Sequence, residues 1–408
     1  MRGVLSLHRR LRPGSFSPGG SPLNPVSYQT SSSVESNRLT RSRASYIPTL
    51  DGWRALAILA VLGYHSPVLS LGPVHFTLLH QYGSQGVDLF FALSGLLICT
   101  RLLTEESEAG SISLSNFYWR RIFRILPAAA LYLAVLAVLG FSGVIPVPPA
   151  AWCAALFFYA NYYATFVSAH HLHSMYWYTG HFWSLAIEEH FYLALPGLLV
   201  LFPRHRKTVL AGLILFFALW YARFHAGYLF RTDLRIDSLL IPALLAVLLQ
   251  SPRIRAWFRA WLHPLIALAL LVATVVAITR VGGWFEAAKP LLKVCYPLVI
   301  VSTLLRPQSW IGRFLELAPL RWIGRISYSL YLWQQLFFPE AFETRGYPAP
   351  PWLRALQHLP VNLACVFILA AISYYFVEKP ILAAGHRFLD RRRERALTQG
   401  SHVRHQDR

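Results

Sequence analysis

Residues 49–65 read TLDGWRALAILAVLGYH, and this stretch predicts the first membrane-spanning helix of the chain. Arg54 and His65 stand eleven positions apart within it. At about 1.5 Å of rise per residue, the imidazole of His65 lies roughly 16 Å deeper than an Arg54 placed at the membrane edge. His65 would then lie near the middle of a hydrocarbon core that is about 30 Å thick. An ionisable side chain at that depth is costly and usually has a function.

Similar apolar runs recur along the rest of the chain. Hydrophobic residues make up 55% of the 408 residues and charged residues only 14%, a balance that water-soluble proteins of this length rarely have. We therefore expect an all-α fold, a polytopic integral membrane helical bundle that forms one integral domain. The predicted spans lie at residues 50–69, 86–104, 125–142, 185–202, 208–224, 235–250, 262–279, 290–305, 325–339 and 357–377, with a further apolar run at 150–168.

The charges of the loops predict how the chain crosses the membrane. Cytoplasmic loops carry an excess of Lys and Arg, and this rule can be applied inward from both ends of the chain. The two directions assign each loop to the same side of the membrane only if residues 150–168 do not cross it. We predict about ten transmembrane helices in the inner (plasma) membrane, both termini in the cytoplasm, and a re-entrant or interfacial helix at 150–168. This topology places Arg54, Arg121 and Arg124 at the cytoplasmic edge and Glu188, Arg235 and Asp237 near the outer edge.

Both ends of the sequence are basic. Residues 1–45 contain seven Arg and one Glu and are rich in Ser, Pro and Gly, which predicts a disordered N-terminal tail. Residues 386–408 form a second basic tail, so the predicted membrane domain is 46–385. In a membrane protein such charge indicates retention in the cytoplasm and attraction to anionic lipid, and we expect no nucleic-acid partner.

We expect no metal site. No C-x-x-C spacing is present, and the cysteines are scattered through apolar stretches as Cys99, Cys153, Cys295 and Cys365. This pattern is typical of small buried hydrophobic residues rather than of a disulfide framework or a zinc site. The histidines at 170, 171 and 173 have no carboxylate or Cys at ligand spacing, which favours an outer loop.

The candidate catalytic groups are His65 and two adjacent carboxylates. Two interpretations of His65 stay open: a backbone carbonyl satisfies the ring, or the ring takes a hydroxyl proton near neutral pH. Glu188 and Glu189 occur in an otherwise apolar helix and point about 100° apart, so one cavity cannot receive both equally. They either form an interfacial pair solvated by headgroups, or one of them orients an imidazole or a substrate hydroxyl.

Other polar residues within the apolar runs are candidates for binding. Ser94 either forms a helix-to-helix hydrogen bond or binds substrate. The guanidinium groups of Arg121 and Arg124 either enforce orientation or hold the phosphates of a nucleotide-bearing cofactor. Arg235 and Asp237 either pair with other charges or bind a polar substrate.

Seven motifs in order resemble the membrane-bound acyltransferase-3 family over about residues 46–385. They are Leu50-Asp51-Gly52-Trp53-Arg54-Ala55 with His65, Gly86 to Gly95, Arg121-x-x-Arg124, Trp183 to Tyr192, Arg235-Ile236-Asp237, Ser327 to Leu332, and Glu378-Lys379-Pro380. One departure stands out, because the family usually has His after the Tyr-Leu-Trp run where this chain has Gln334. An amide cannot act as a base, although it can still form hydrogen bonds.

The resemblance implies an O-acyltransferase that moves an acyl group, typically acetyl, from cytoplasmic acyl-CoA to a hydroxyl of a cell-surface carbohydrate or glycolipid. His65 is the implied base, and no cofactor is bound permanently. The expected catalytic residues are His65, Glu188 and Glu189, the donor-binding residues Arg54, Arg121 and Arg124, and the substrate-binding residues Asp88, Ser94, Arg235, Asp237 and Tyr331. Direct transfer and a covalent acyl intermediate both stay open. The alternatives are a transporter that uses the same buried charges and a catalytically inactive family member.

Overall fold

The structure is a computed structural model that describes residues 46–66, 70–71, 74–75, 82–170, 176–224, 230–280, 285–338 and 350–406. The predicted disordered tail at 1–45 lies outside these residues. Contacts divide the chain into two units, Met1–Tyr46 and Ile47–Arg408. The second unit contains every helix described below.

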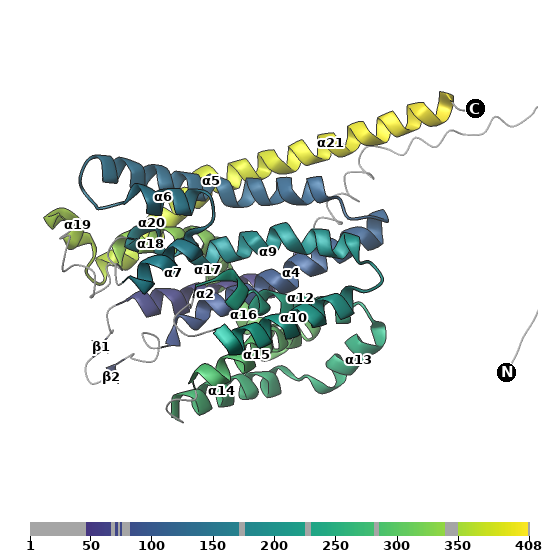
Figure 1. Cartoon of the computed structure of the whole chain (residues 1–408), viewed down its shortest axis with the longest axis horizontal. Coiled ribbons are helices and arrows are strands. Elements are labelled where there is room, and N and C mark those ends of the chain that lie inside the picture. The colour runs from purple at the N-terminus through teal and green to yellow at the C-terminus, as the bar shows by residue number, and fades with distance from the viewer. Residues whose placement is uncertain are drawn as a thin grey trace, which may run out of the picture. The chain divides into compact units, whose positions relative to one another are not determined.

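The second unit is helical (Figure 1). Its longer helices are α2 (Pro48–His65), α4 (Gln85–Ala109), α5 (Leu114–Phe141), α9 (Phe182–Leu201), α10 (Arg206–Phe224), α12 (Asp237–Leu248), α14 (Pro264–Arg280), α15 (Phe285–Leu305), α18 (Ser327–Phe337), α20 (Val361–Ile372) and α21 (Lys379–Gln406). Each predicted span overlaps one of these helices. The π-helix η2 (Ser373–Glu378) joins α20 to α21.

Shorter elements connect the long helices. They are α6 (Pro149–Leu156), α7 (Ala160–Ala169), α8 (Trp177–Gly180), α11 (Thr232–Arg235), α13 (Pro252–Trp261), α16 (Trp310–Leu315), α17 (Ala318–Arg325) and α19 (Pro351–Leu356). Two strands of two residues each, β1 (Ser70–Leu71) and β2 (Val74–His75), pair antiparallel with Ser70 opposite His75.

Local sequence signals set several of the helix ends. α2 begins at Pro48, whose fixed φ and missing N–H suit the first turn of a helix. The hydroxyl of Ser113 caps α5 by accepting a hydrogen bond from the backbone N–H of Asn116. α4 ends at Gly110, which takes the left-handed conformation with φ of 77°.

Helix α2 lies at the centre of the bundle. It packs against α4, α15, α16, α17 and α18, and its buried residues surround the helix. Two glycines permit the closest of these approaches. A Cβ on Gly324 would lie 1.9 Å from the carbonyl oxygen of Asp51, and a Cβ on Gly52 would lie 2.2 Å from that of Leu315. Only glycine fits where backbones pack this tightly.

Five of the described helices are long and apolar enough to cross a membrane. They run over Gln85–Ala109, Leu114–Phe141, Trp177–Leu201, Arg206–Phe224 and Val361–Arg392. A sixth results if α12 and α13, which bend by 109°, count as one span. The prediction of a helical membrane protein is confirmed, and the count of ten crossings stays a prediction. Helix α2 is not among the five, because Asp51, Arg54 and His65 lower its hydropathy while neighbouring helices cover its sides.

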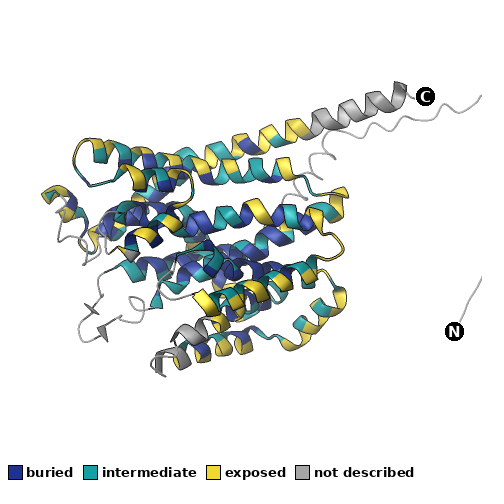
Figure 2. Ribbon diagram, in the orientation of Figure 1, coloured by how far each residue is buried: buried dark blue, intermediate teal, exposed yellow. Residues whose placement is uncertain are grey.

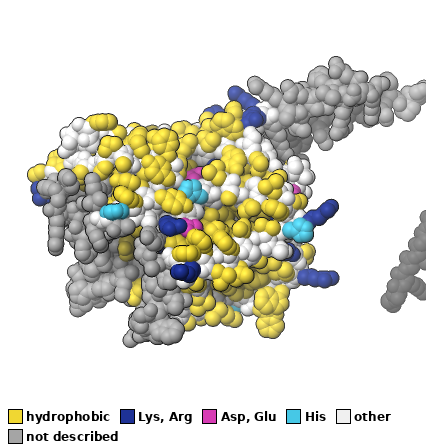
Figure 3. All heavy atoms as spheres, viewed as in Figure 1, with side chains coloured by type: hydrophobic (Ala, Val, Ile, Leu, Met, Phe, Trp, Pro, Cys, Tyr) yellow, Lys and Arg dark blue, Asp and Glu magenta, His cyan; other side chains and the backbone are white. Residues whose placement is uncertain are grey.

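Burial follows the expected pattern for such a bundle (Figure 2). The inner turns are buried, whereas apolar side chains such as Leu193, Leu219 and Ile368 are more than half exposed. Hydrophobic side chains make up most of the coloured surface in Figure 3, and Lys and Arg appear there singly or in small groups. Exposed apolar side chains around a helical bundle are typical of contact with lipid.

The run at 150–168 forms two short helices instead of one. They are α6, of 8 residues, and α7, of 10 residues, and a break at Phe158, with φ of 54°, separates them. Each is shorter than the roughly 20 residues that a span requires. The re-entrant or interfacial position of residues 150–168 stays a prediction.

Helix residues near the loops that were predicted to be cytoplasmic contact one another. Arg206, at the start of α10, donates to both carboxylate oxygens of Glu106 at 2.6 and 2.8 Å. Arg392 in α21 donates to the hydroxyl of Ser115 at 3.2 Å, near the start of α5. Helix α21 runs without a break from residue 379, so the predicted domain boundary at 385 falls inside it.

Replacing Gly324 by Ala should destabilise the bundle, because the added methyl group would overlap the backbone of α2 at Asp51. Overpacking of this kind costs about 1–3 kcal/mol of unfolding free energy. The measurement is the thermal unfolding midpoint in detergent. Gly212→Ala is the matched control, since a Cβ there meets open space and Ala favours a helix over Gly. Equal midpoints for the two variants would contradict the packing described here.

Candidate active site

A pocket opens between α2, α4, α5, α9 and α18. Its polar lining consists of Arg54, Ser94, Arg121, Arg124, Ser184, Glu188, Tyr192, Ser327, Tyr328 and Tyr331, and its apolar lining of Val87, Phe90, Phe91, Leu97, Ile98, Ile125 and Leu185. The lining residues of α4 and of α9 each recur every three or four positions, so each helix presents one face to the pocket. Six predicted site residues meet here: Arg54, Arg121, Arg124, Ser94, Glu188 and Tyr331.

Two hydroxyl groups hold the carboxylate of Glu188. Ser94 donates to its Oε1 at 3.1 Å, and Tyr192 donates to its Oε2 at 2.8 Å. The bond from Ser94 joins α4 to α9, as one of the two interpretations of Ser94 required. Tyr192 was not predicted as a site residue, although its position four residues after Glu188 places both on one helix face.

The arginines give the pocket an excess of positive charge. Arg54 forms an ion pair with Asp51 at 3.2 Å. The guanidinium of Arg121 lies over the rings of Tyr192 and Phe117, at 5.2 and 5.7 Å from their centroids. Over the described part of the chain, neither Arg121 nor Arg124 has an ion pair. Glu188 is therefore the single carboxylate among the lining residues, against three guanidinium groups.

The depth predicted for Glu188 stays a prediction, although the structure brings this residue closer to the arginines than we expected. The sequence placed it near the outer edge, away from the arginines, whereas the structure places Glu188 and all three arginines in the lining of one pocket. Two features explain the difference. Helix α9 begins only at Phe182, after the separate turn of α8, and long arginine side chains extend well away from their own backbone.

Tyr331 connects α18 to the start of α9. Its hydroxyl donates to the carbonyl oxygen of His181 at 3.0 Å and lies 2.7 Å from the hydroxyl of Ser184. Tyr328, one turn earlier, donates to the carbonyl oxygen of Ile125 at 3.0 Å. The Ser327 to Leu332 motif thus holds three helices around the pocket.

His65 does not line the pocket. It ends α2 about three turns beyond Arg54, on the same helix face. Its Nδ1 lies 3.1 Å from the carbonyl oxygen of Val61, and its ring contacts Tyr64 and Trp177 edge-on, at 5.0 and 5.9 Å between centroids. The backbone interpretation therefore accounts for one ring nitrogen. Glu189 is half-buried on α9 and also lies outside the pocket lining.

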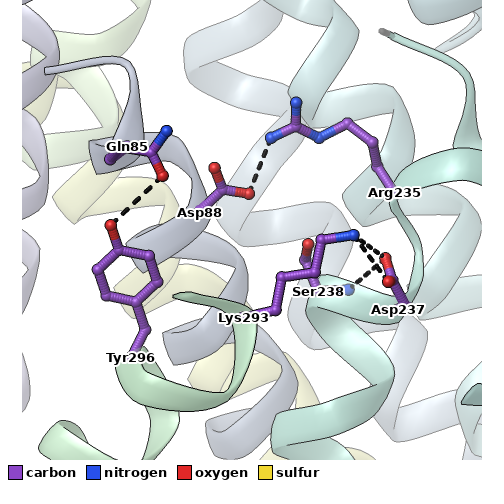
Figure 4. Close-up of polar contacts among 7 residues, drawn as sticks. All are labelled: Gln85, Asp88, Arg235, Asp237, Ser238, Lys293 and Tyr296. Atoms are coloured by element: carbon purple, nitrogen blue, oxygen red, sulfur yellow. Dashed lines mark hydrogen bonds and ion pairs between the residues drawn. The ribbon is translucent and has the colours of Figure 1, made fainter. Parts of the chain in front are cut away.

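The remaining predicted residues form ion pairs, as Figure 4 shows. Arg235 donates to Asp88 at 2.8 Å, and Lys293 donates to both carboxylate oxygens of Asp237 at 2.7 Å. The backbone N–H of Ser238 adds a third bond to Asp237 at 3.0 Å. Of the two interpretations, the structure thus shows charge pairing, which joins α4 to α11 and α12 to α15. Lys293 was not predicted as a site residue. Its position as a lone cation among the apolar residues of 290–305 could have indicated it.

The buried carboxylate of Glu378 was not predicted as a site residue. Glu378 accepts hydrogen bonds from Ser329 and Ser373, and it ends the π-helix η2. Single π-helical turns often occur beside functional sites. Among the described residues, no three His, Cys, Asp or Glu side chains are placed to share a metal ion, and the four cysteines form no disulfide.

Comparison with known proteins identifies relatives of the whole helical unit. A family model described as an acyltransferase domain matches residues 47–376. The chain is 29% identical to the peptidoglycan O-acetyltransferase OatA of Listeria monocytogenes over 375 residues, which cover 85% of this chain and 58% of that protein. It is 30% identical over 380 residues to a Bacillus subtilis protein named "Putative peptidoglycan O-acetyltransferase YrhL", with 85% and 56% covered. The chain thus spans little more than half the length of these relatives. No solved structure matches it.

The ion pair between Lys293 and Asp237 should be structural, because both side chains are about nine-tenths buried. Lys293→Met leaves an unpaired carboxylate, which costs about 3–5 kcal/mol of stability. The double variant Lys293→Met with Asp237→Leu should recover most of that loss. Thermal unfolding of the wild type, both single variants and the double variant measures the coupling energy. Additive losses would show that the two charges do not depend on each other.

Proposed function

Because the chain belongs to the acyltransferase family whose model spans residues 47–376, we propose that it O-acetylates a hydroxyl of a cell-surface carbohydrate from within the membrane. The names of its relatives support peptidoglycan as the acceptor. The donor we propose is cytoplasmic acetyl-CoA. The proposal includes ten crossings, with the arginine end of the pocket and both termini facing the cytoplasm.

The observation that carries this proposal is the convergence of Arg54, Arg121 and Arg124 on one pocket. Guanidinium groups bind phosphate oxygens with charge-assisted hydrogen bonds. Arg121 and Arg124 have no ion pair over the described part of the chain, so their charge is available to an anionic ligand. The phosphates of a nucleotide-bearing donor suit such a pocket.

The distance between the arginines and His65 favours coenzyme A over a small phosphorylated donor. Eleven residues of helix separate Arg54 from His65, a rise of roughly 16 Å. In an acyl phosphate, the phosphate adjoins the acyl carbon, so the molecule cannot reach both residues. In acyl-CoA, a long flexible arm separates the phosphates from the thioester. This arm would run along the face of α2 that both residues share.

The proposed reaction is acyl transfer from a thioester to an alcohol. His65 takes the proton from the acceptor hydroxyl, and the hydroxyl oxygen attacks the thioester carbonyl. A C–O bond forms, the C–S bond breaks, and the CoA thiolate leaves and recovers the proton. Glu188, held by Ser94 and Tyr192, would balance the arginine charges at the donor end. We assign Glu189, which lies outside the lining, the lesser role of the two carboxylates.

His65→Ala should reduce kcat for transfer of acetyl from acetyl-CoA to peptidoglycan fragments by roughly 10²- to 10⁴-fold, the range for loss of a general base. Labelled acetyl-CoA and protein reconstituted in lipid vesicles provide the measurement. His170→Ala is the control, since His170 is exposed and lies outside the pocket. A His65→Ala protein with wild-type turnover would refute the assignment of the base.

Arg121→Gln and Arg124→Gln should each raise the KM for acetyl-CoA by roughly ten- to a hundred-fold, because a hydrogen bond to a charged group contributes about 1.5–3 kcal/mol. The KM for the acceptor should change little. Arg253→Gln, at an exposed position in α13, is the matched control. If both pocket variants kept the wild-type KM for acetyl-CoA, the phosphates would not bind at these arginines.

A further inference from the structure

A group of buried polar atoms beyond the Tyr331 end of the pocket lacks hydrogen-bond partners among the described residues. Within the described residues, both ring nitrogens of His181 are unsatisfied, as are both amide atoms of Gln334 and the Oε1 of Gln335. The exposed fractions of these three side chains are 4%, 0% and 3%. We call these three residues the unpartnered cluster.

These atoms impose a cost that the fold itself does not recover. A buried polar group without a partner costs about 1–3 kcal/mol, and native proteins contain few such groups. Here five atoms from three residues share one region of the bundle. Such a concentration indicates that something polar binds to them.

The unpartnered cluster continues the pocket lining by one helical turn. His181 caps the start of α9 and precedes Ser184 and Glu188 by three and seven positions, the spacing of one helix face. On α18, Gln334 follows Tyr331 by three positions. The Tyr331 hydroxyl contacts both His181 and Ser184, so the two extensions lie beside each other.

The same region reaches His65. Trp177 begins the short turn α8 that leads to His181, and its ring contacts the His65 imidazole at 5.9 Å. Over the part of the chain that the structure describes, the indole N–H of Trp177 is also buried without a partner. The polar surface therefore runs from the arginines through Tyr331 and the unpartnered cluster to His65.

We propose that the unpartnered cluster is the acceptor subsite, where Gln334 and His181 form hydrogen bonds with the hydroxyl groups of a neutral sugar. This inference rests on the proposed function. An amide offers one donor group and one acceptor atom, which suits adjacent hydroxyls of a sugar ring. Asp88, Arg235, Asp237 and Lys293 are less suited, because these charges already pair with one another.

Gln334 would determine acceptor specificity without taking part in proton transfer. A site built to bind a hydroxyl rejects ligands that lack one, because its own polar groups would then stay unpaired. Replacing the amide by an aliphatic side chain of similar size should remove this recognition and also the cost of the unpaired atoms. Activity and stability should therefore change in opposite directions.

The experiment compares Gln334→Leu with Gln357→Leu, using soluble glycan fragments of peptidoglycan and acetyl-CoA. Gln334→Leu should raise the KM for the glycan at least ten-fold, leave the KM for acetyl-CoA unchanged, and raise the thermal midpoint. Gln357 is also a buried Gln, with 7% of its surface exposed, but its amide donates to the carbonyl oxygen of Leu336 at 3.1 Å. Gln357→Leu should lower the midpoint and leave both KM values unchanged.

A wild-type glycan KM in Gln334→Leu would overturn the proposal. A second measurement tests the subsite if the variant does not fold or if the wild type shows no transfer. In it, the glycan fragments should raise the thermal midpoint of the wild-type protein. Gln334→Asn, which keeps the amide one methylene shorter, should retain part of that shift. No shift in the wild type would reject the subsite, whereas a shift without transfer would reject only the proposed function.

Discussion

A polar group inside a lipid bilayer must find its partner within the protein, and this constraint organises the bundle. Asp88 and Arg235 satisfy each other across 147 positions of sequence, and Lys293 satisfies Asp237 in the same way. Glu188 receives hydrogen bonds from Ser94 and Tyr192. Two departures from the rule among the described residues concern the pocket and its surroundings: Arg121 and Arg124 have no ion pair, and the unpartnered cluster contains polar atoms without hydrogen bonds. Both departures lie along one polar surface, where the proposed donor and acceptor would supply the missing partners.

The packing around α2 gives this polar surface its geometry. Neighbouring helices surround α2, and Gly52 and Gly324 allow two of them to approach its backbone closely. Because protein rather than lipid covers its sides, α2 can carry Asp51, Arg54 and His65 without the hydropathy of an isolated span.

Much of this architecture could be predicted from the sequence, because apolar periodicity and loop charge report directly on helices in a membrane. Helices at the predicted spans were recognisable in this way, whereas the number of crossings stays a prediction. The six residues of the pocket were recognisable as polar positions in apolar runs and from the motifs that resemble the family. Pairings between distant helices were not, since the sequence gives no offset of one helix relative to another. The pairing of Lys293 with Asp237 and the meeting of Glu188 with the arginines were not predicted for this reason. The sequence also could not predict that His65 lies outside the pocket lining. Helical rise gives the depth of a residue along its own helix but not how far a cavity extends.

The three turns of α2 between Arg54 and His65 have a consequence for which donors can react. Helix α2 is rigid and carries an anion-binding group at one end and a base at the other. The distance between the two groups therefore selects donors by their length. Under the proposed function, selection among donors would depend on the reach of the arm between phosphate and thioester more than on the shape of the acyl group. Removing or adding a helical turn in α2 would then change the preferred donor to one with a shorter or longer arm, while the acyl-transfer reaction stayed the same.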